Sequence, residues 1–135
     1  MRKAKSGSEG MGKKGFNLFK GRAKDYINDK EKSKRLLDDA KEKAQRKKGS
    51  LGAIWDDIQL LFHLFEDWIK GKYKEIPIGS IIIIIVALIY FVIPTDIIPD
   101  FIIGAGFFDD AAVIAFAINS IRNDFEKYKI WKYGR

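Results

Sequence analysis

A block of 20 residues without a charged side chain, Ile76 to Thr95, constrains the fold of this chain more than any other feature. At about 1.5 Å of rise per residue, a helix of this length covers about 30 Å, which matches the hydrocarbon core of a bilayer. A single strand is excluded, because strands run for about 4–8 residues. Each central isoleucine favours insertion by roughly 0.3–0.6 kcal/mol. The block therefore predicts a membrane-spanning helix over residues 76–95.

The apolar stretch that follows this block is interrupted by aspartates and glycines. An aspartate at the centre of a bilayer costs about 2.5–3.5 kcal/mol, so this stretch would not insert alone. A turn over residues 94–108 would instead gather the acidic side chains at one membrane interface, and a return helix would follow over residues 109–128. We therefore expect an all-α fold built on an integral membrane helical hairpin, with the second helix either spanning or re-entrant.

The part of the chain before residue 51 is strongly basic, with 17 Lys or Arg residues against 7 acidic ones. Residues 1–15 are rich in Gly, Ser and Lys and predict a disordered basic tail. Residues 16–50 predict a basic helical arm, and residues 51–135 the membrane domain. Dense positive charge attracts anionic headgroups or nucleic acid. The arm is dominated by lysine and poor in aromatic residues. We therefore expect it to bind anionic lipid headgroups, and nucleic acid is an unlikely partner.

Residues 51–70 show the pattern of an amphipathic helix, with apolar residues at three- and four-residue spacing. The opposite face is polar and mainly acidic, and includes His63 and Asp67. Such a helix either packs on a protein core or lies in a membrane interface, and the acidic face favours packing against protein. A compact bundle over residues 51–121, in which the isoleucine-rich helix is simply buried, is a further alternative.

Aromatic and basic residues flank the predicted hairpin at both outer ends, as in an interfacial belt. By the positive-inside rule, both termini are predicted to face the cytoplasm. The aromatic members are Trp68, Tyr73, Tyr128, Trp131 and Tyr133, and the basic ones are Lys70, Lys72, Lys74, Arg122, Lys127, Lys129 and Lys132.

Residues 90–110 read YFVIPTDIIPDFIIGAGFFDD. This segment resembles the motif of the YkvA-like domain-of-unknown-function family, and the resemblance covers roughly residues 58–121. Many members have a further proline where this chain has Ile103, which implies a less rigid turn here. The resemblance implies a small membrane-associated helical domain and brings no established activity. It places the motif at Tyr90, Pro94, Asp96, Pro99, Asp100, Gly106, Asp109 and Asp110.

Four of these residues, Asp96, Asp100, Asp109 and Asp110, are the one constellation with possible chemistry. The structural interpretation is that they cap the helices on either side of the turn. Alternatively, their hard oxygen ligands suit a divalent cation such as Mg²⁺, Ca²⁺ or Mn²⁺, with Tyr90 and Asn119 as further candidates. A proton or cation relay is a variant of this second interpretation, and would require an oligomer to enclose a pore.

Catalytic machinery is not evident in the sequence. The chain has no cysteine and one histidine, His63, and it contains no phosphate-binding loop or histidine pair. We therefore expect a non-enzymatic membrane protein without a cofactor, acting as a structural or interaction module. Its expected partners are lipids, other membrane helices or further copies of itself, and the alternative is an oligomeric protein that handles cations or protons.

Overall fold

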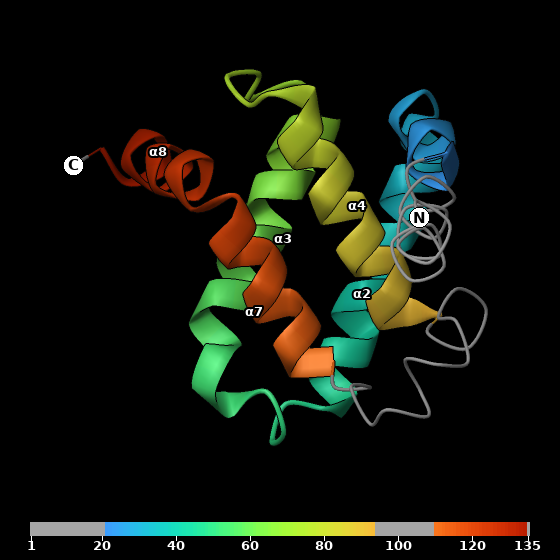
Figure 1. The fold of residues 1–135 in the computed structure, drawn as a ribbon, viewed down its shortest axis with the longest axis vertical. Helices are drawn as coiled ribbons and strands as arrows, with labels where there is room; N and C mark the ends of the chain where they lie inside the picture. The colour runs from blue at the N-terminus through green and yellow to red at the C-terminus, as the bar shows by residue number, and fades with distance from the viewer. Residues whose placement is uncertain (1–20, 94–109, 135) are drawn as a thin grey trace, which may run out of the picture.

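The computed structural model describes residues 21–93 and 110–134, which form a bundle of helices (Figure 1). Every regular element within these ranges is helical and none is a strand, which confirms the predicted all-α class. Residues 21–27 are helical. The elements that follow are α2 (Lys30–Arg46), the 3-10 turn η1 (Gly52–Ile54), α3 (Trp55–Ile69), α4 (Ile78–Val92), α7 (Asp110–Ser120) and α8 (Arg122–Tyr133).

Helix α4 carries the isoleucine run and packs against both α7 and α2. Its side chains Ile81, Ile84, Ile85 and Leu88 are fully buried. Complete burial of such a side chain stabilises a fold by roughly 1.5–3 kcal/mol, so α4 is the core helix of the bundle. A buried isoleucine helix within a compact bundle was the alternative that the sequence left open.

The predicted bounds of this helix, residues 76–95, are wrong at both ends. The backbone of Pro77 is extended (φ −63°, ψ 150°) and precedes the first helical turn, so α4 begins at Ile78. It ends at Val92, after 15 residues, which span about 22 Å at ~1.5 Å each. Across residues 21–93 and 110–134, no helix has the length and apolar character that crossing a bilayer requires.

Helix α2, from the predicted basic arm, is part of the bundle. The side chain of Asp29 accepts a hydrogen bond from the backbone N–H of Lys32 (3.1 Å) and caps the start of the helix. One face of α2 is buried against α3 and α4. On this helix Lys43 Nζ donates a hydrogen bond to the carbonyl of Phe91 (2.5 Å), near the end of α4 where helix carbonyls lack partners. The buried residues of α2 are Ser33, Leu36, Leu37, Ala40 and Ala44.

The predicted single return helix over residues 109–128 is two helices in the structure. The chain turns at Ile121, and α7 and α8 point in different directions (Figure 1). This break brings Phe125 and Tyr128 into the buried core, where α8 contacts α3. Helix α8 ends at Tyr133 and is capped by Gly134, whose left-handed φ of 70° favours glycine and whose N–H donates to the carbonyl of Ile130 (2.8 Å).

Candidate functional site

The two helices that flank the Pro/Asp-rich segment, α4 and α7, pack against each other. They lie side by side and run in opposite directions (Figure 1), so the predicted pairing of the two helices is confirmed. A groove of about 160 Å³ runs along their outer side. It is lined by Ile83, Val86, Ala87 and Tyr90 of α4 and by Val113, Phe116 and Ala117 of α7.

Beyond Asp110 at the start of α7, this helix pair carries no charged side chain. Residues 76–93 and 111–121 contain no acidic or basic side chain. The ring of Phe116 is 73 % exposed, and Ile83, Val86 and Val113 beside it are half-buried. We call the groove-lining residues, together with the exposed residues of α7, the hairpin face. These exposed residues are Ala112, Ala115, Phe116, Asn119 and Ser120. An exposed apolar patch of this kind is typical of a contact surface for a protein or a membrane.

Of the site residues predicted from the sequence, the structure places Tyr90 in this groove, where it is largely buried. Asp110 is the first residue of α7, and Asn119 is exposed on the same helix. Within the described ranges, no three or more carboxylate or histidine side chains are grouped to hold a metal ion. The divalent-cation site stays a prediction, because three of its four aspartates, Asp96, Asp100 and Asp109, lie outside the described residues. The motif residues Pro94, Pro99 and Gly106 also lie outside them.

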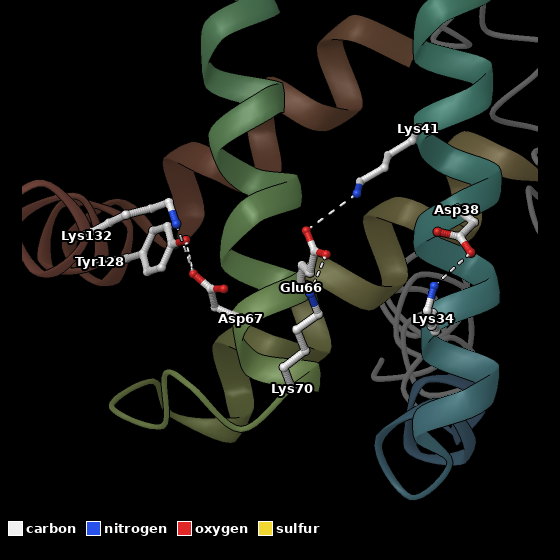
Figure 2. Close-up of polar contacts among 8 residues, drawn as sticks. All are labelled: Lys34, Asp38, Lys41, Glu66, Asp67, Lys70, Tyr128 and Lys132. Atoms are coloured by element: carbon white, nitrogen blue, oxygen red, sulfur yellow. Dashed lines mark hydrogen bonds and ion pairs between the residues drawn. The ribbon is translucent and has the colours of Figure 1, made fainter.

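A buried polar network joins α3 to α8, and the sequence did not indicate it. Asp67 is only 8 % exposed and accepts hydrogen bonds from Tyr128 Oη (2.6 Å) and Lys132 Nζ (3.3 Å) (Figure 2). Periodicity in the sequence places Asp67 on the polar face of its helix, and in the structure α8 covers this position. The spacing of Tyr128 and Lys132, four residues apart on one helix face, was the available signal.

The pKa of Asp67 reports a balance between burial and this network. Burial by itself raises the pKa, because it disfavours the charged carboxylate. The hydrogen bonds from Tyr128 and Lys132 and the charges of Lys132 and Lys72 outweigh burial, so the pKa of Asp67 is lowered. Burial, followed by the contact with Asp67, raises the pKa of Tyr128. Asp67 is therefore ionised and Tyr128 protonated at neutral pH.

The neighbouring Glu66 connects two further elements. Its carboxylate contacts Lys70 at 3.0 Å and Lys41 of α2 at 3.5 Å (Figure 2). The hydrogen bond from Lys70 is the main cause that lowers the pKa of Glu66. These groups are partly exposed, so each ion pair stabilises the fold by no more than about 1 kcal/mol. They orient α2 and α3 and provide no reactive group.

The structure brings together only some of the aromatic residues of the predicted interfacial belt. The Tyr73 ring lies 5.0 Å from Tyr128 and 4.9 Å from Trp131, measured between ring centroids. Trp68 lies apart from these rings: it stacks on Phe65, and Lys30 Nζ lies 4.2 Å from its centroid. One end of the bundle therefore combines aromatic rings from the loop before α4 with rings from α8.

Comparison with known proteins connects the hairpin face to a family. Residues 80–116 match the family described as "Protein of unknown function (DUF1232)", and this range holds every groove-lining residue except Ala117. The chain is 33 % identical over 103 residues to the "Uncharacterized membrane protein YkvA" of Bacillus subtilis, an alignment that covers 76 % of this chain and 97 % of the relative. No solved structure matches the chain. The chain therefore belongs to the DUF1232 family, with YkvA as a relative.

Proposed function

We propose that this protein is a non-enzymatic, membrane-associated interaction module whose hairpin face contacts the membrane. The observation that carries the proposal is the absence of charge from residues 76–93 and 111–121 of this helix pair, with the exposed ring of Phe116 beside an apolar groove. Removing a large apolar side chain from water is favourable by roughly 1.5–3 kcal/mol, so covering this surface favours association.

Two further observations support a membrane as the contacting phase. The relative from Bacillus subtilis bears the name of a membrane protein. The basic N-terminal part of the chain adds attraction to anionic headgroups, at about 1 kcal/mol for each Lys or Arg near the surface. Expected partners are lipids first, and then other membrane helices or a second copy that cover the same face.

A non-enzymatic role agrees with the chemistry of the groove. Among the groove-lining residues, only Tyr90 carries a polar side-chain atom. General acid–base or nucleophilic catalysis needs at least two cooperating groups in reach of a substrate. The groove offers an apolar receptor for a side chain or an acyl chain.

We propose that the bundle keeps its fold at the membrane and turns the hairpin face toward the acyl chains. A spanning hairpin with both termini in the cytoplasm, the arrangement predicted from the sequence, is the alternative. It would require α4 to leave its contacts with α2, including the Lys43 hydrogen bond at Phe91. The buried side chains Ile85 and Leu88 would exchange protein neighbours for lipid.

Fractionation of cells that express the full chain tests this function. We expect the protein in the membrane pellet, retained in high salt and released by alkaline carbonate. Phe116→Glu should lower the membrane-bound fraction about tenfold, because the ring contributes roughly 1.5–3 kcal/mol of apolar contact. His63→Glu places the same charge on an exposed position of α3 and should partition like the natural protein.

Two results would change the account. Recovery of the natural protein in the supernatant, or equal partitioning of the Phe116 and His63 variants, would contradict the proposal. Retention of the protein after the carbonate wash would favour the spanning hairpin over the folded bundle.

A further inference from the structure

A second contact surface lies where the loop of residues 70–77 meets α8. Tyr73 of this loop is buried and its ring contacts both Tyr128 and Trp131. Ser80 Oγ, in the first turn of α4, donates a hydrogen bond to Asp124 of α8 (2.5 Å). The loop therefore packs against α8, and the first turn of α4, which follows the loop, is joined to α8 by a hydrogen bond.

Large apolar side chains are exposed on α8. Ile130 is 57 %, Trp131 47 % and Tyr133 58 % exposed. Trp131 is nevertheless held in place, because its ring stacks 5.7 Å from Tyr128 and lies beside Tyr73. Tryptophan and tyrosine are enriched where a bilayer meets water, because one part of the side chain is apolar and the other forms hydrogen bonds.

Positive charge surrounds these aromatic residues. The loop and α8 together carry seven Lys or Arg residues and three acidic ones. Several of the cations are paired: Lys70 with Glu66, Lys132 with Asp67, and both Arg122 and Lys129 with Glu126.

Three exposed lysines of this end, Lys72, Lys74 and Lys127, form no ion pair with any residue that the structure describes. Their charge can therefore meet an anionic partner, although the charge of Lys72 also acts on Asp67.

We infer that this end of the bundle, the headgroup surface (Lys72, Lys74, Lys127, Ile130, Trp131 and Tyr133), docks on an anionic bilayer. The lysines meet the phosphates, and Trp131 enters the interface together with Ile130. The inference rests on the proposed membrane association but uses residues outside the hairpin face. Exposed Trp and Ile beside Lys favour a bilayer over nucleic acid, which offers no apolar phase to receive them.

Tryptophan fluorescence on vesicles with brominated acyl chains tests the docking. The full chain with Trp55→Phe and Trp68→Phe retains Trp131 as its one tryptophan. We expect blue-shifted emission that brominated lipids quench on vesicles of phosphatidylcholine and phosphatidylglycerol, with weaker quenching on phosphatidylcholine alone or in high salt. A single-stranded oligonucleotide should leave the emission unshifted.

The matched control retains Trp55 instead, through Trp68→Phe and Trp131→Phe. Trp55 is the first residue of α3 and lies about 21 Å along that helix from its last residue, Ile69. The loop that carries Lys72 and Lys74 of the headgroup surface follows Ile69. Trp55 should remain unquenched. Equal quenching of the two tryptophans, no quenching of Trp131, or a shift produced by the oligonucleotide as by vesicles would each overturn the inference.

Charge variants test the lysines. Replacing Lys72, Lys74 and Lys127 together by Gln should weaken binding to anionic vesicles about 100-fold, because each lysine near an anionic surface strengthens binding about fivefold. Circular dichroism should remain unchanged, because these side chains are exposed. As control, Lys24, Lys34 and Lys48 replaced by Gln remove the same charge from exposed positions around α2, and should weaken binding clearly less than the first variant does. An equal loss in both variants would overturn the inference.

Failure of the inference differs from failure of the proposed function. If the natural protein stays with membranes and Phe116→Glu releases it while Trp131 remains unquenched, only the headgroup surface is refuted. If the natural protein binds neither cell membranes nor anionic vesicles, both are refuted.

Discussion

Two helix pairs in this bundle are joined by different chemistry. The pair α4 and α7 combines apolar faces, with Leu88 and Ile114 fully buried. The pair α3 and α8 is joined around the buried carboxylate of Asp67, which Tyr128 and Lys132 contact. The free energy of apolar burial does not depend on pH. A contact that is built around a buried, hydrogen-bonded carboxylate loses stability when that carboxylate is protonated, so its stability depends on pH. The stability of the α4–α7 contact should therefore be nearly independent of pH, whereas that of the α3–α8 contact should depend on the ionisation of Asp67.

The largest effect is expected in the apolar pair. Leu88→Ala should lower the free energy of unfolding by about 2–5 kcal/mol, because the removed atoms lose burial and leave a cavity. Denaturant titration measures this cost, which should be similar at pH 7 and at pH 5. Ile83→Ala, at a half-buried position on the same helix, should cost clearly less. Equal costs for the two variants would contradict the assignment of α4 as the core helix.

The next largest effect is expected in the polar pair. Asp67→Ala should lower the free energy of unfolding by about 2 kcal/mol, because the buried hydroxyl of Tyr128 loses its acceptor. Tyr128→Phe should cost about 1.5 kcal/mol, since one hydrogen bond to a charged group is lost. Thermal and denaturant unfolding measure both. His63→Ala, at an exposed position on α3, serves as the control, and a similar loss there would remove the special role of Asp67.

The pH dependence of stability should reveal Asp67 directly. Its folded pKa is lowered, so its contribution is fully present above the ordinary value of 3.8 and is lost as pH falls through the lower folded pKa. The natural protein should therefore lose more stability below about pH 4 than Asp67→Asn does. Unfolding midpoints between neutral pH and strong acid measure the difference. Parallel curves for the two proteins would show that Asp67 is not stabilised by its partners.

The smallest effect on stability is expected on the hairpin face. Phe116→Ser should change the free energy of unfolding by less than about 0.5 kcal/mol, because the ring is exposed. The same variant should nevertheless reduce membrane partitioning. Unfolding and vesicle binding measured on one preparation compare the two properties. A large loss of stability would mean that the ring belongs to the core and not to a contact surface.

Periodicity and apolar content predicted the helical segments and their order, because these depend on local spacing, but they joined α7 and α8 into one helix. The isoleucine run was recognised as a helix and α3 as amphipathic. Local spacing does not show whether lipid or protein covers an apolar helix. Lipid and protein both accept isoleucine, and the residues of α2 that cover α4 are a short series of Leu and Ala within a basic segment. Hydropathy along the chain therefore could not distinguish a spanning helix from a buried one.

Two other features depend on contacts between distant parts of the chain. The break at Ile121 has no glycine or proline to indicate it, and it arises where α8 turns to pack on α3. Asp67 is buried only because Tyr128 and Lys132, 61 and 65 residues later, come to lie over it. Of the site residues predicted from the motif, Tyr90 lines the groove. The cation site at the acidic cluster stays a prediction.

A spin label on the hairpin face reports directly whether this surface contacts the membrane. The chain has no cysteine, so Phe116→Cys and the control His63→Cys each provide a unique attachment site. On membranes, the label at position 116 should become accessible to apolar oxygen and protected from a water-soluble nickel chelate, while the label at position 63 should remain accessible to the chelate. Equal accessibility of both labels to the chelate would contradict membrane contact through this face.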